Sequence, residues 1–292
     1  MNPMKNDKYY GLALTLIVLI STITGGAKHE GSEDTIFYSQ SEPTSLTATA
    51  KNNFPETQTA LATVALEIPP AISAVSAVVK YLDTNEAIFS VSQNQQWPIA
   101  SLTKLMTAVV AVENIPADAK IKISEKAIAT EGGAGNIVAG KAYTREELLK
   151  VLLKVSSNDA AAAFSEFLGR EIFLELMNQK AISLGMYNTR YFDSSGLSAL
   201  NQSMASDLEK LVIYIYNRHP EILAITREPE GNIHPFAAWA NFLGGKTGFI
   251  DEASGNLISL FNYRGRPLLI VVLGSEDRAK DTQVLYDYLT SR

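Results

Sequence analysis

The chain of 292 residues contains no cysteine, which excludes disulfide bonds and thiolate metal sites. Histidine is nearly as rare, with three residues: His29, His219 and His234. The last two each precede a proline and are predicted in turns, which argues against a Ser-His-Asp triad or a zinc site. Basic charge is also scarce, since 25 Lys and Arg stand against 31 Asp and Glu, a net charge of -6. We therefore expect no metal and no nucleic-acid partner, because nucleic-acid binding needs a basic surface.

One long apolar run, from Tyr9 to Thr24, lies near the N-terminus. Its length falls between that of a signal-peptide core and that of a membrane-spanning helix. Lys5 and Lys8 precede it and acidic residues follow, which predicts that the rest of the chain is exported. No good cleavage site follows, so we expect residues 1–27 to be an uncleaved membrane anchor at the extracytoplasmic face. The alternative is a cleaved signal peptide and a secreted or periplasmic protein.

Residues 28–72 are rich in Ser, Thr, Glu, Asn and Pro and contain few large apolar side chains. Such a segment cannot bury enough apolar surface to offset its ordering entropy. We expect a disordered tether here, which holds a folded domain formed by residues 73–292 above the membrane.

The folded domain alternates between strand-like and helix-like patterns. Ala74–Leu82 and Ala87–Ser92 form one predicted hairpin, and residues 255–274 form another. Between them, Ser101–Asn114 is apolar almost all round, which indicates a buried helix. A capping box at Thr144 opens a further helix. These elements predict an α+β fold, an α/β sandwich in which one antiparallel sheet is built from both ends of the domain and the middle forms a helical lobe.

Three short motifs occur in order: S-x-x-K at Ser101–Lys104, S-x-N at Ser156–Asn158 and K-T-G at Lys246–Gly248. Each is weak by itself, and S-x-N also occurs at Ser92–Asn94 and Ser254–Asn256. The ordered set is informative because the predicted helices and strands around it suit the motifs.

Ser101 is predicted at the amino end of the buried helix, where free N–H groups and the helix dipole stabilise an oxyanion. Lys104 lies one turn further along on the same face. A neutral lysine can take the proton of a serine hydroxyl if burial and nearby positive charge lower its pKa. Lys246 could supply that positive charge while remaining protonated. A surface-capping serine beside a solvent-directed lysine is the alternative, which the apolar helix disfavours.

The other two motifs have structural alternatives as well. Ser156 and Asn158 precede an alanine-rich segment, where both residue types suit a helix N-cap. Lys246 can bind a carboxylate, and Gly248 allows a strand edge to approach a substrate closely. A phosphate loop is the alternative at Lys246, but Ala240 stands where the first glycine of that loop is required.

The ordered motifs resemble the signature of the penicillin-recognising serine enzymes. The surrounding segments PIASLTKLMTA, TREELLKVLLKVSSNDAAAAF and GGKTGFIDEASGNL are similar to those of the D-alanyl-D-alanine carboxypeptidase family, the low-molecular-weight penicillin-binding proteins. The resemblance extends from about Ala74 to the C-terminus. It implies the β-lactamase/transpeptidase-like fold and an enzyme of the bacterial cell wall that needs no cofactor.

The resemblance also implies a role for each motif residue. Ser101 is the acyl-ester nucleophile, Lys104 its proton acceptor, and Ser156 relays a proton between Lys104 and the leaving amine. The implied substrate-binding residues are Asn158, Lys246, Thr247, Gly248 and Phe249, the last through a backbone N–H that joins that of Ser101 in an oxyanion hole. Many relatives carry a hydroxyl residue at the position of Ile250, so we expect one hydrogen bond fewer to the substrate carboxylate.

The expected substrate is a peptidoglycan stem peptide ending in D-Ala-D-Ala, with β-lactams as covalent inhibitors. A D,D-endopeptidase that cuts cross-links is the main alternative. The C-terminal β-domain and amphipathic anchor helix of some relatives are absent from this sequence, which favours that alternative.

A β-lactamase is disfavoured, since Met186–Ser203 contains Asp193 but no glutamate and Glu166 is expected to face solvent. A β-lactam sensor is disfavoured because no signalling domain precedes the anchor. Gly132–Asn136 is expected to be a flexible loop near the cleft.

Overall fold

The computed structural model describes residues 69–84 and 86–290, which belong to the second of two compact units, Ala65–Arg292. The predicted anchor and all but the last four residues of the predicted tether lie outside the described residues. Within the described ranges, no helix has the length and apolar character needed to cross a membrane.

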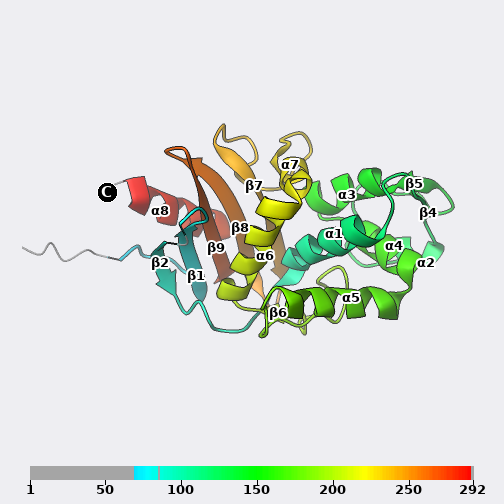
Figure 1. The fold of residues 1–292 in the computed structure, drawn as a ribbon, viewed down its shortest axis with the longest axis horizontal. Coiled ribbons are helices and arrows are strands. Elements are labelled where there is room, and N and C mark those ends of the chain that lie inside the picture. Colours follow the sequence, from blue (N-terminus) through cyan, green and yellow to red (C-terminus); the bar gives the residue numbers. More distant parts are fainter. Residues whose placement is uncertain (1–68, 85, 291–292) are drawn as a thin grey trace, which may run out of the picture. The chain divides into compact units, whose positions relative to one another are not determined.

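A five-stranded antiparallel sheet forms the centre of this unit (Figure 1). In spatial order its strands are β2 (Ala87–Val91), β1 (Ser76–Tyr81), β9 (Arg266–Ser275), β8 (Ser254–Tyr263) and β7 (Phe242–Ile250). The first strand of the domain pairs with the last, as Ser76 opposite Leu273 and Tyr81 opposite Leu268. The prediction of one sheet built from both ends of the domain is confirmed, and β7 is left as an edge strand.

Both predicted hairpins are present. The second, between β8 and β9, turns at Arg264 and Gly265, whose φ angles are 52° and 83°. Two positive φ angles in a two-residue loop match the right-handed twist of the adjoining strands.

Helices cover both faces of the sheet, and the side chains of β9 alternate between two apolar clusters. Leu269 and Val271 belong to the cluster that includes α6, whereas Leu268 and Ile270 pack with α8. Burial on both faces explains why this strand is a continuous apolar run. The helices are η1 (Ala100–Leu102), α1 (Thr103–Asn114), α2 (Glu125–Ile128), α3 (Arg145–Lys154), α4 (Asn158–Leu168), α5 (Arg170–Ser183), α6 (Ala205–Arg218), α7 (Pro220–Arg227) and α8 (Arg278–Thr290).

The helical lobe beside the sheet is built around α1 (Figure 1). Every residue from Thr103 to Ala111 is buried, which confirms the predicted central helix. The predicted start needs correction, because Ser101 lies in the 3-10 turn η1 and α1 begins two residues later. The capping box at Thr144 is present at the start of α3. Two short ribbons complete the fold: β3 (Trp97–Pro98) with β6 (Gln202–Ser203), and β4 (Lys120–Lys122) with β5 (Ala142–Thr144).

Candidate active site

The three sequence motifs meet where the helical lobe adjoins the edge of the sheet. Ser101 lies in η1, Lys104 in the first turn of α1, and Ser156 in the short connection between α3 and α4. Lys246 lies on the edge strand β7. Three segments far apart in the chain are thus brought to one place.

Lys104 is completely buried, and its amine contacts three oxygens. The distances from Nζ are 2.9 Å to Ser101 Oγ, 2.7 Å to Asn158 Oδ1 and 2.6 Å to the carbonyl oxygen of Ser195. The last two atoms can only accept hydrogen bonds, whereas a serine hydroxyl can also donate. A neutral Lys104 therefore keeps two N–H bonds to Asn158 and Ser195 and directs its lone pair at the Ser101 hydroxyl. This arrangement is suited to removing the proton from Ser101.

Burial also sets the charge of Lys104. It lowers the pKa of this amine from 10.5 to about 7, while the negative charge of Asp193 opposes part of the shift. Desolvation disfavours the charged ammonium. Near neutral pH a large fraction of Lys104 is consequently in the form that can act as a base.

Lys246 is equally buried, with 1% of its surface exposed. Its Nζ lies 2.9 Å from Ser156 Oγ and 3.0 Å from the carbonyl oxygen of Thr247. Burial, and then the charges of Lys104 and Arg278, lower the pKa of Lys246 well below its usual value. Burial thus acts on both amines, and it disfavours the charged form of Lys246 as it does that of Lys104.

The partner of Ser156 also differs from the expected one. In the part of the chain that the structure describes, the hydrogen bond of its hydroxyl is with Lys246 and not with Lys104. Ser156 has a φ of 61°, an unusual value for a residue other than glycine.

The N-cap of α4 is Ser157, to which the sequence analysis assigned no role. Its Oγ accepts a hydrogen bond from the Ala160 N–H at 3.2 Å. The neighbouring Ser156 is therefore not needed as a cap, and its hydroxyl is available to the site. Asn158 is the first residue of α4, and its side chain bridges Lys104 and the carbonyl oxygen of Glu131, to which Nδ2 donates at 2.6 Å.

The glycine-rich segment 132–136 lies beside the site, as expected. A Cβ atom added to Gly132 would lie 2.9 Å from Asn158 Nδ2, and the φ of this residue is 72°. The loop can approach Asn158 closely because no side chain stands at this position.

Strand β7 packs closely against the turn that carries Ser101. A Cβ atom on Gly248 would lie 2.8 Å from the Ile99 carbonyl oxygen and 3.2 Å from the Ser101 nitrogen. The close approach that glycine allows here is to the turn of Ser101, and the expected approach to a substrate stays a prediction. Thr247 is buried, whereas the Phe249 side chain is 60% exposed. Arg278, at the start of α8, donates a hydrogen bond to the Gly248 carbonyl oxygen.

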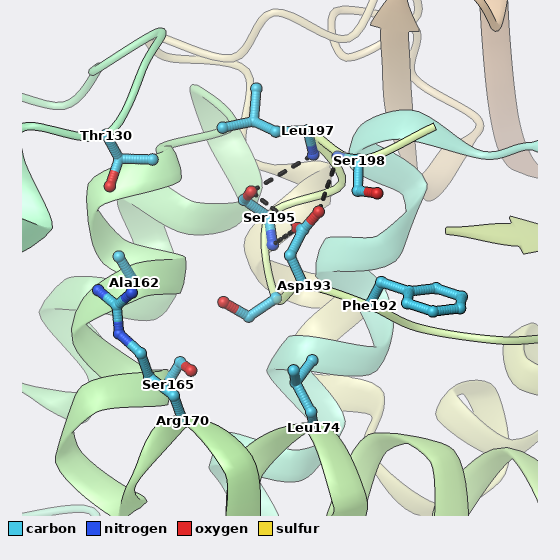
Figure 2. Close-up of a pocket in the computed structure, with 11 residues that line it drawn as sticks. Thr130, Ala162, Ser165, Arg170, Leu174, Phe192, Asp193, Ser195, Leu197 and Ser198 are labelled. Atoms are coloured by element: carbon cyan, nitrogen blue, oxygen red, sulfur yellow. Dashed lines mark hydrogen bonds between the residues drawn. The ribbon is translucent and has the colours of Figure 1, made fainter. Parts of the chain in front are cut away.

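Sequence reasoning missed the loop that contributes the Ser195 carbonyl (Figure 2). Asp193 Oδ1 accepts hydrogen bonds from Ser195 N at 2.6 Å, Ser195 Oγ at 2.9 Å and Gly196 N at 2.5 Å. Asp193 Oδ2 accepts from Ser198 N at 2.7 Å. Gly196 has a φ of 86°, and an added Cβ would lie 2.0 Å from the Ala100 carbonyl oxygen. The loop is thus held firmly against the turn of Ser101.

The sequence did contain a signal for this loop. Asp followed by Ser and Gly residues is typical of a turn in which the carboxylate accepts backbone N–H groups. Nothing local shows that the turn contacts Lys104, because Ser195 lies 91 positions further along the chain. A pocket of about 470 Å³ borders the same loop, with Ala162 and Ser165 of α4 and Leu174 of α5 on its other side (Figure 2).

Neither candidate histidine takes part in this constellation. His234 is buried beneath the sheet, where its Nε2–H donates to the Ile258 carbonyl oxygen at 3.0 Å. Burial lowers the pKa of His234 to about 3, so the ring is neutral. His219 pairs with Glu113 and Glu221 at the junction of α6 and α7.

Glu166 does not simply face solvent, as was expected. Its carboxylate is bonded to Ser124 and Arg170, with both distances 2.5 Å. The hydrogen bonds of the Glu166 carboxylate are therefore with Ser124 and Arg170. Among the residues that the structure describes, no group of three or more His, Cys, Asp or Glu side chains could hold a metal ion.

Substituting Ser156 and Ser157 one at a time distinguishes the expected catalytic role of Ser156 from the role of Ser157 as the N-cap of α4. Ser157→Ala removes the acceptor of the Ala160 N–H, and we expect it to lower the free energy of unfolding by about 1 kcal/mol while acylation by a penicillin continues near the parent rate. Ser156→Ala should slow acylation strongly, and it also removes one hydrogen-bond partner of the buried Lys246 amine. Urea unfolding and intact-mass measurement of the adduct test both. Equal loss of acylation in the two variants would show that the two roles are not separate.

Asp193→Asn tests the loop. Acylation requires neutral Lys104, so its rate in the parent should rise with pH through about 7 and be lost below it. Removing the Asp193 charge lowers the pKa of Lys104 further and shifts this midpoint to lower pH. An amide cannot accept all four hydrogen bonds, so the maximal rate should also fall by about tenfold or more. The measurement is a pH profile of penicillin acylation, with the exposed Asp118→Asn as control. An unchanged profile in Asp193→Asn would contradict the assigned role.

Comparison with known proteins extends over most of the chain. The chain is 34% identical over 237 residues to a D-alanyl-D-alanine endopeptidase of Escherichia coli K12. This match covers 74% of this chain and 75% of that protein. It is 27% identical to a D-alanyl-D-alanine carboxypeptidase of Mycobacterium tuberculosis, over 67% of this chain and 73% of that protein.

Solved structures show the same likeness. The crystal structure of a D-alanyl-D-alanine carboxypeptidase from Mycobacterium tuberculosis H37Rv matches with a TM-score of 0.73 and 26% identity, over 78% of this chain and 95% of that one. Penicillin-binding protein D2 of Listeria monocytogenes, in its cefotaxime-bound form, matches with a TM-score of 0.68 and 28% identity, over 76% and 99%. These matches confirm the resemblance, the expected fold and the expected class of serine peptidase. The D-alanyl-D-alanine carboxypeptidase family matches residues 63–277, and the chain belongs to this family.

Proposed function

We propose that this protein removes the terminal D-alanine from peptidoglycan stem peptides through an acyl-enzyme on Ser101. The observation that carries the proposal is the environment of Lys104. Its amine is buried, has its pKa lowered to about 7, and contacts Ser101 Oγ as the one partner among three that can donate a proton.

Acylation follows from this geometry. Neutral Lys104 takes the hydroxyl proton as Ser101 Oγ attacks the carbonyl carbon of the scissile bond. The backbone N–H groups of Ser101 and Phe249 stabilise the oxyanion that forms. The C–N bond then breaks, the Ser156 hydroxyl gives its proton to the leaving amine, and Ser156 takes up in exchange the proton that Lys104 accepted from Ser101. This relay is supported by the bond from Lys246 to Ser156 Oγ, which leaves the hydroxyl proton of Ser156 free to be donated.

In deacylation, water takes the place of Ser101 as the attacking group, and Ser101 becomes the leaving group. A water molecule attacks the ester carbon, and Lys104 accepts its proton. The ester C–O bond breaks, Ser101 recovers its hydroxyl proton, and the shortened peptide leaves with a new carboxylate. The products are free D-alanine from the first step and the trimmed stem peptide from the second.

Recognition of the free C-terminus is assigned to Lys246 and Thr247. Both are buried, so a carboxylate placed against them forms charge-assisted hydrogen bonds with little competition from water. A bound carboxylate also raises the pKa of Lys246 and offsets the effect of burial. Asn158 positions Lys104 and the substrate amide. Ile250 has no hydroxyl to add a further hydrogen bond.

Cleavage of cross-links is the second candidate function. It is favoured by three relatives named D-alanyl-D-alanine endopeptidase, from Escherichia coli, Pseudomonas aeruginosa and Haemophilus influenzae, which are 34%, 31% and 34% identical to this chain. The same nucleophile, base and oxyanion hole would serve both reactions, which differ only in the group that leaves.

The proposed location is the extracytoplasmic side of the bacterial membrane, where peptidoglycan lies. The family is consistent with this location. The anchor over residues 1–27 rests on the apolar run and its basic N-terminal flank, and the tether over residues 28–72 on composition. The catalytic domain over residues 73–292 is supported by the family match to residues 63–277.

The first test is release of D-alanine from an acylated L-Lys-D-Ala-D-Ala peptide by the full-length chain. The parent should release it, and Ser101→Ala should release none and form no penicillin adduct. An adduct that survives in Ser101→Ala would show that the nucleophile is misassigned. A parent that forms a stable adduct but releases no D-alanine would favour the endopeptidase.

Lys246→Ala tests carboxylate recognition with a matched pair of peptides, one with a free C-terminus and one amidated. The parent should prefer the free acid by about 10- to 100-fold in kcat/KM, the range for hydrogen bonds to a charged group. Lys246→Ala should lose most of this preference. If the ratio of the two kcat/KM values stays at the parent's level, the carboxylate is bound elsewhere.

A further inference from the structure

A hollow of about 440 Å³ lies on the helical lobe, next to the loop that follows α5. Its lining includes Gln96 just before β3, Ile182 near the end of α5, and Tyr187, Asn188 and Arg190 of the loop. We call these five residues the Tyr187 surface. The reaction chemistry and the carboxylate recognition assigned above do not involve it.

Two large side chains of the Tyr187 surface are open to solvent. Tyr187 is 78% exposed and Ile182 is 61% exposed. Among the large apolar side chains of the residues that the structure describes, Tyr187 is the most exposed. An exposed aromatic ring at the edge of a hollow indicates a surface that a ligand covers.

The polar groups around this ring are planar, and most of their hydrogen-bonding capacity is unused. Gln96 Nε2 donates to the Asn188 carbonyl oxygen at 2.9 Å, which joins the two segments of the surface. The Arg190 guanidinium lies over the Phe192 ring, 5.8 Å from its centre. Within the described part of the chain, neither the Asn188 side-chain amide nor the Arg190 guanidinium has a hydrogen-bond partner or an acidic partner.

The Tyr187 surface lies close to the reactive turn. Gln202 of β6 pairs with Pro98 of β3, three residues before Ser101. Along its other edge Gln202 forms a bridge with Arg190, through two hydrogen bonds of 2.9 Å and 3.1 Å. Neighbouring strands lie about 4.8 Å apart, so the backbone of Arg190 is about 10 Å from that of Pro98.

Phe192 connects the Tyr187 surface to the loop beside the site. Its ring lies under Arg190, is 48% exposed and also borders the pocket next to Ser195 (Figure 2). The Ser195 carbonyl oxygen contacts Lys104. A ligand that extends from the hollow along Phe192 therefore approaches the site.

We propose that the Tyr187 surface binds the glycan of peptidoglycan, a chain of N-acetyl amino sugars, while a stem peptide carried by that glycan occupies the site at Ser101. The identity of this polymer rests on the proposed function. About four peptide residues lie between the sugar and the scissile bond, and together they extend at most about 14 Å. This length is comparable to the separation of the surface from the reactive turn, so both contacts can be made by one substrate molecule.

The chemistry of the surface matches a sugar. A pyranose ring has apolar C–H faces that pack on an aromatic ring, and it carries hydroxyl and acetamido groups around its edge. Tyr187 supplies the aromatic ring. The amides of Gln96 and Asn188 supply both donors and acceptors, and the Arg190 guanidinium supplies further donors.

Two substrates test the proposal on the full-length chain: a stem pentapeptide alone, and the same pentapeptide attached to its N-acetyl disaccharide. In the parent, the disaccharide should raise kcat/KM for release of D-alanine by about 5- to 30-fold, the range for one aromatic contact with one or two hydrogen bonds. Tyr187→Ala should lose most of this gain. A ratio of the two kcat/KM values near one in the parent, or a ratio in Tyr187→Ala equal to the parent's, would overturn the proposal.

The matched control is Tyr216→Ala on α6. This tyrosine is also exposed, at 38%, but lies outside the Tyr187 surface. Tyr216→Ala should keep the parent's ratio of kcat/KM values. A loss of the ratio in Tyr216→Ala equal to that in Tyr187→Ala would overturn the proposal, because the effect would then not be specific to this surface.

Binding of peptide-free glycan strands separates recognition from catalysis. Calorimetric titration of the full-length chain, with detergent present for the predicted anchor, gives Kd. The Ser101→Ala variant should bind these strands as the parent does, whereas Tyr187→Ala should bind them about fivefold more weakly. Equal Kd values for the parent and Tyr187→Ala would overturn the proposal.

Failure of the proposed function has a different signature. A parent that releases no D-alanine and forms no penicillin adduct refutes the Ser101 chemistry, whereas glycan binding that depends on Tyr187 still supports the role of the surface. Release of D-alanine with no effect of the disaccharide refutes the role of the surface alone.

Discussion

The site depends on one physical constraint, the burial of Lys104 beneath Ser101. A buried amine sheds its proton more readily, and two of its three neighbours are oxygens that can only accept. The remaining neighbour is Ser101, the proposed nucleophile. The fold supplies this environment from α1, from the amide of Asn158 and from the loop anchored by Asp193. None of these elements is unusual by itself. Together they create the buried environment that lowers the pKa of Lys104 to about 7.

A second constraint is the close approach of β7 to η1. Gly248 leaves no room for a side chain between the strand and Ser101, which holds the edge of the sheet against the reactive turn. The same strand carries Lys246, which is buried like Lys104. The charge of Lys104 adds to burial in lowering the pKa of Lys246. In the proposed mechanism a substrate carboxylate offsets this effect, which makes the site electrostatically complementary to a free C-terminus.

Much of the architecture followed from local patterns. The alternation of Ala74–Leu82, the apolar helix after Ser101 and the capping box at Thr144 each identified its element, because burial on one face or all round leaves a periodic trace. The three motifs identified the site residues, and the structure brings Ser101, Lys104, Ser156, Asn158 and Lys246 together. The errors were local as well. Ser157, not Ser156, caps α4, and α1 begins after Ser101, because hydrogen bonding at a helix end is decided by backbone angles that residue type alone does not specify.

By itself the sequence determined the α+β class and the family and indicated the candidate reactive groups, since these depend on residue types at short spacing and on periodic burial. Only the tertiary structure decided how those groups act on one another. The contacts of Lys104 with Ser195 and of Ser156 with Lys246 join residues 91 and 90 positions apart. Such proximity, and the loss of solvent that shifts both lysine pKa values, arises when the sheet and helical lobe pack together and has no counterpart in any local stretch of the chain.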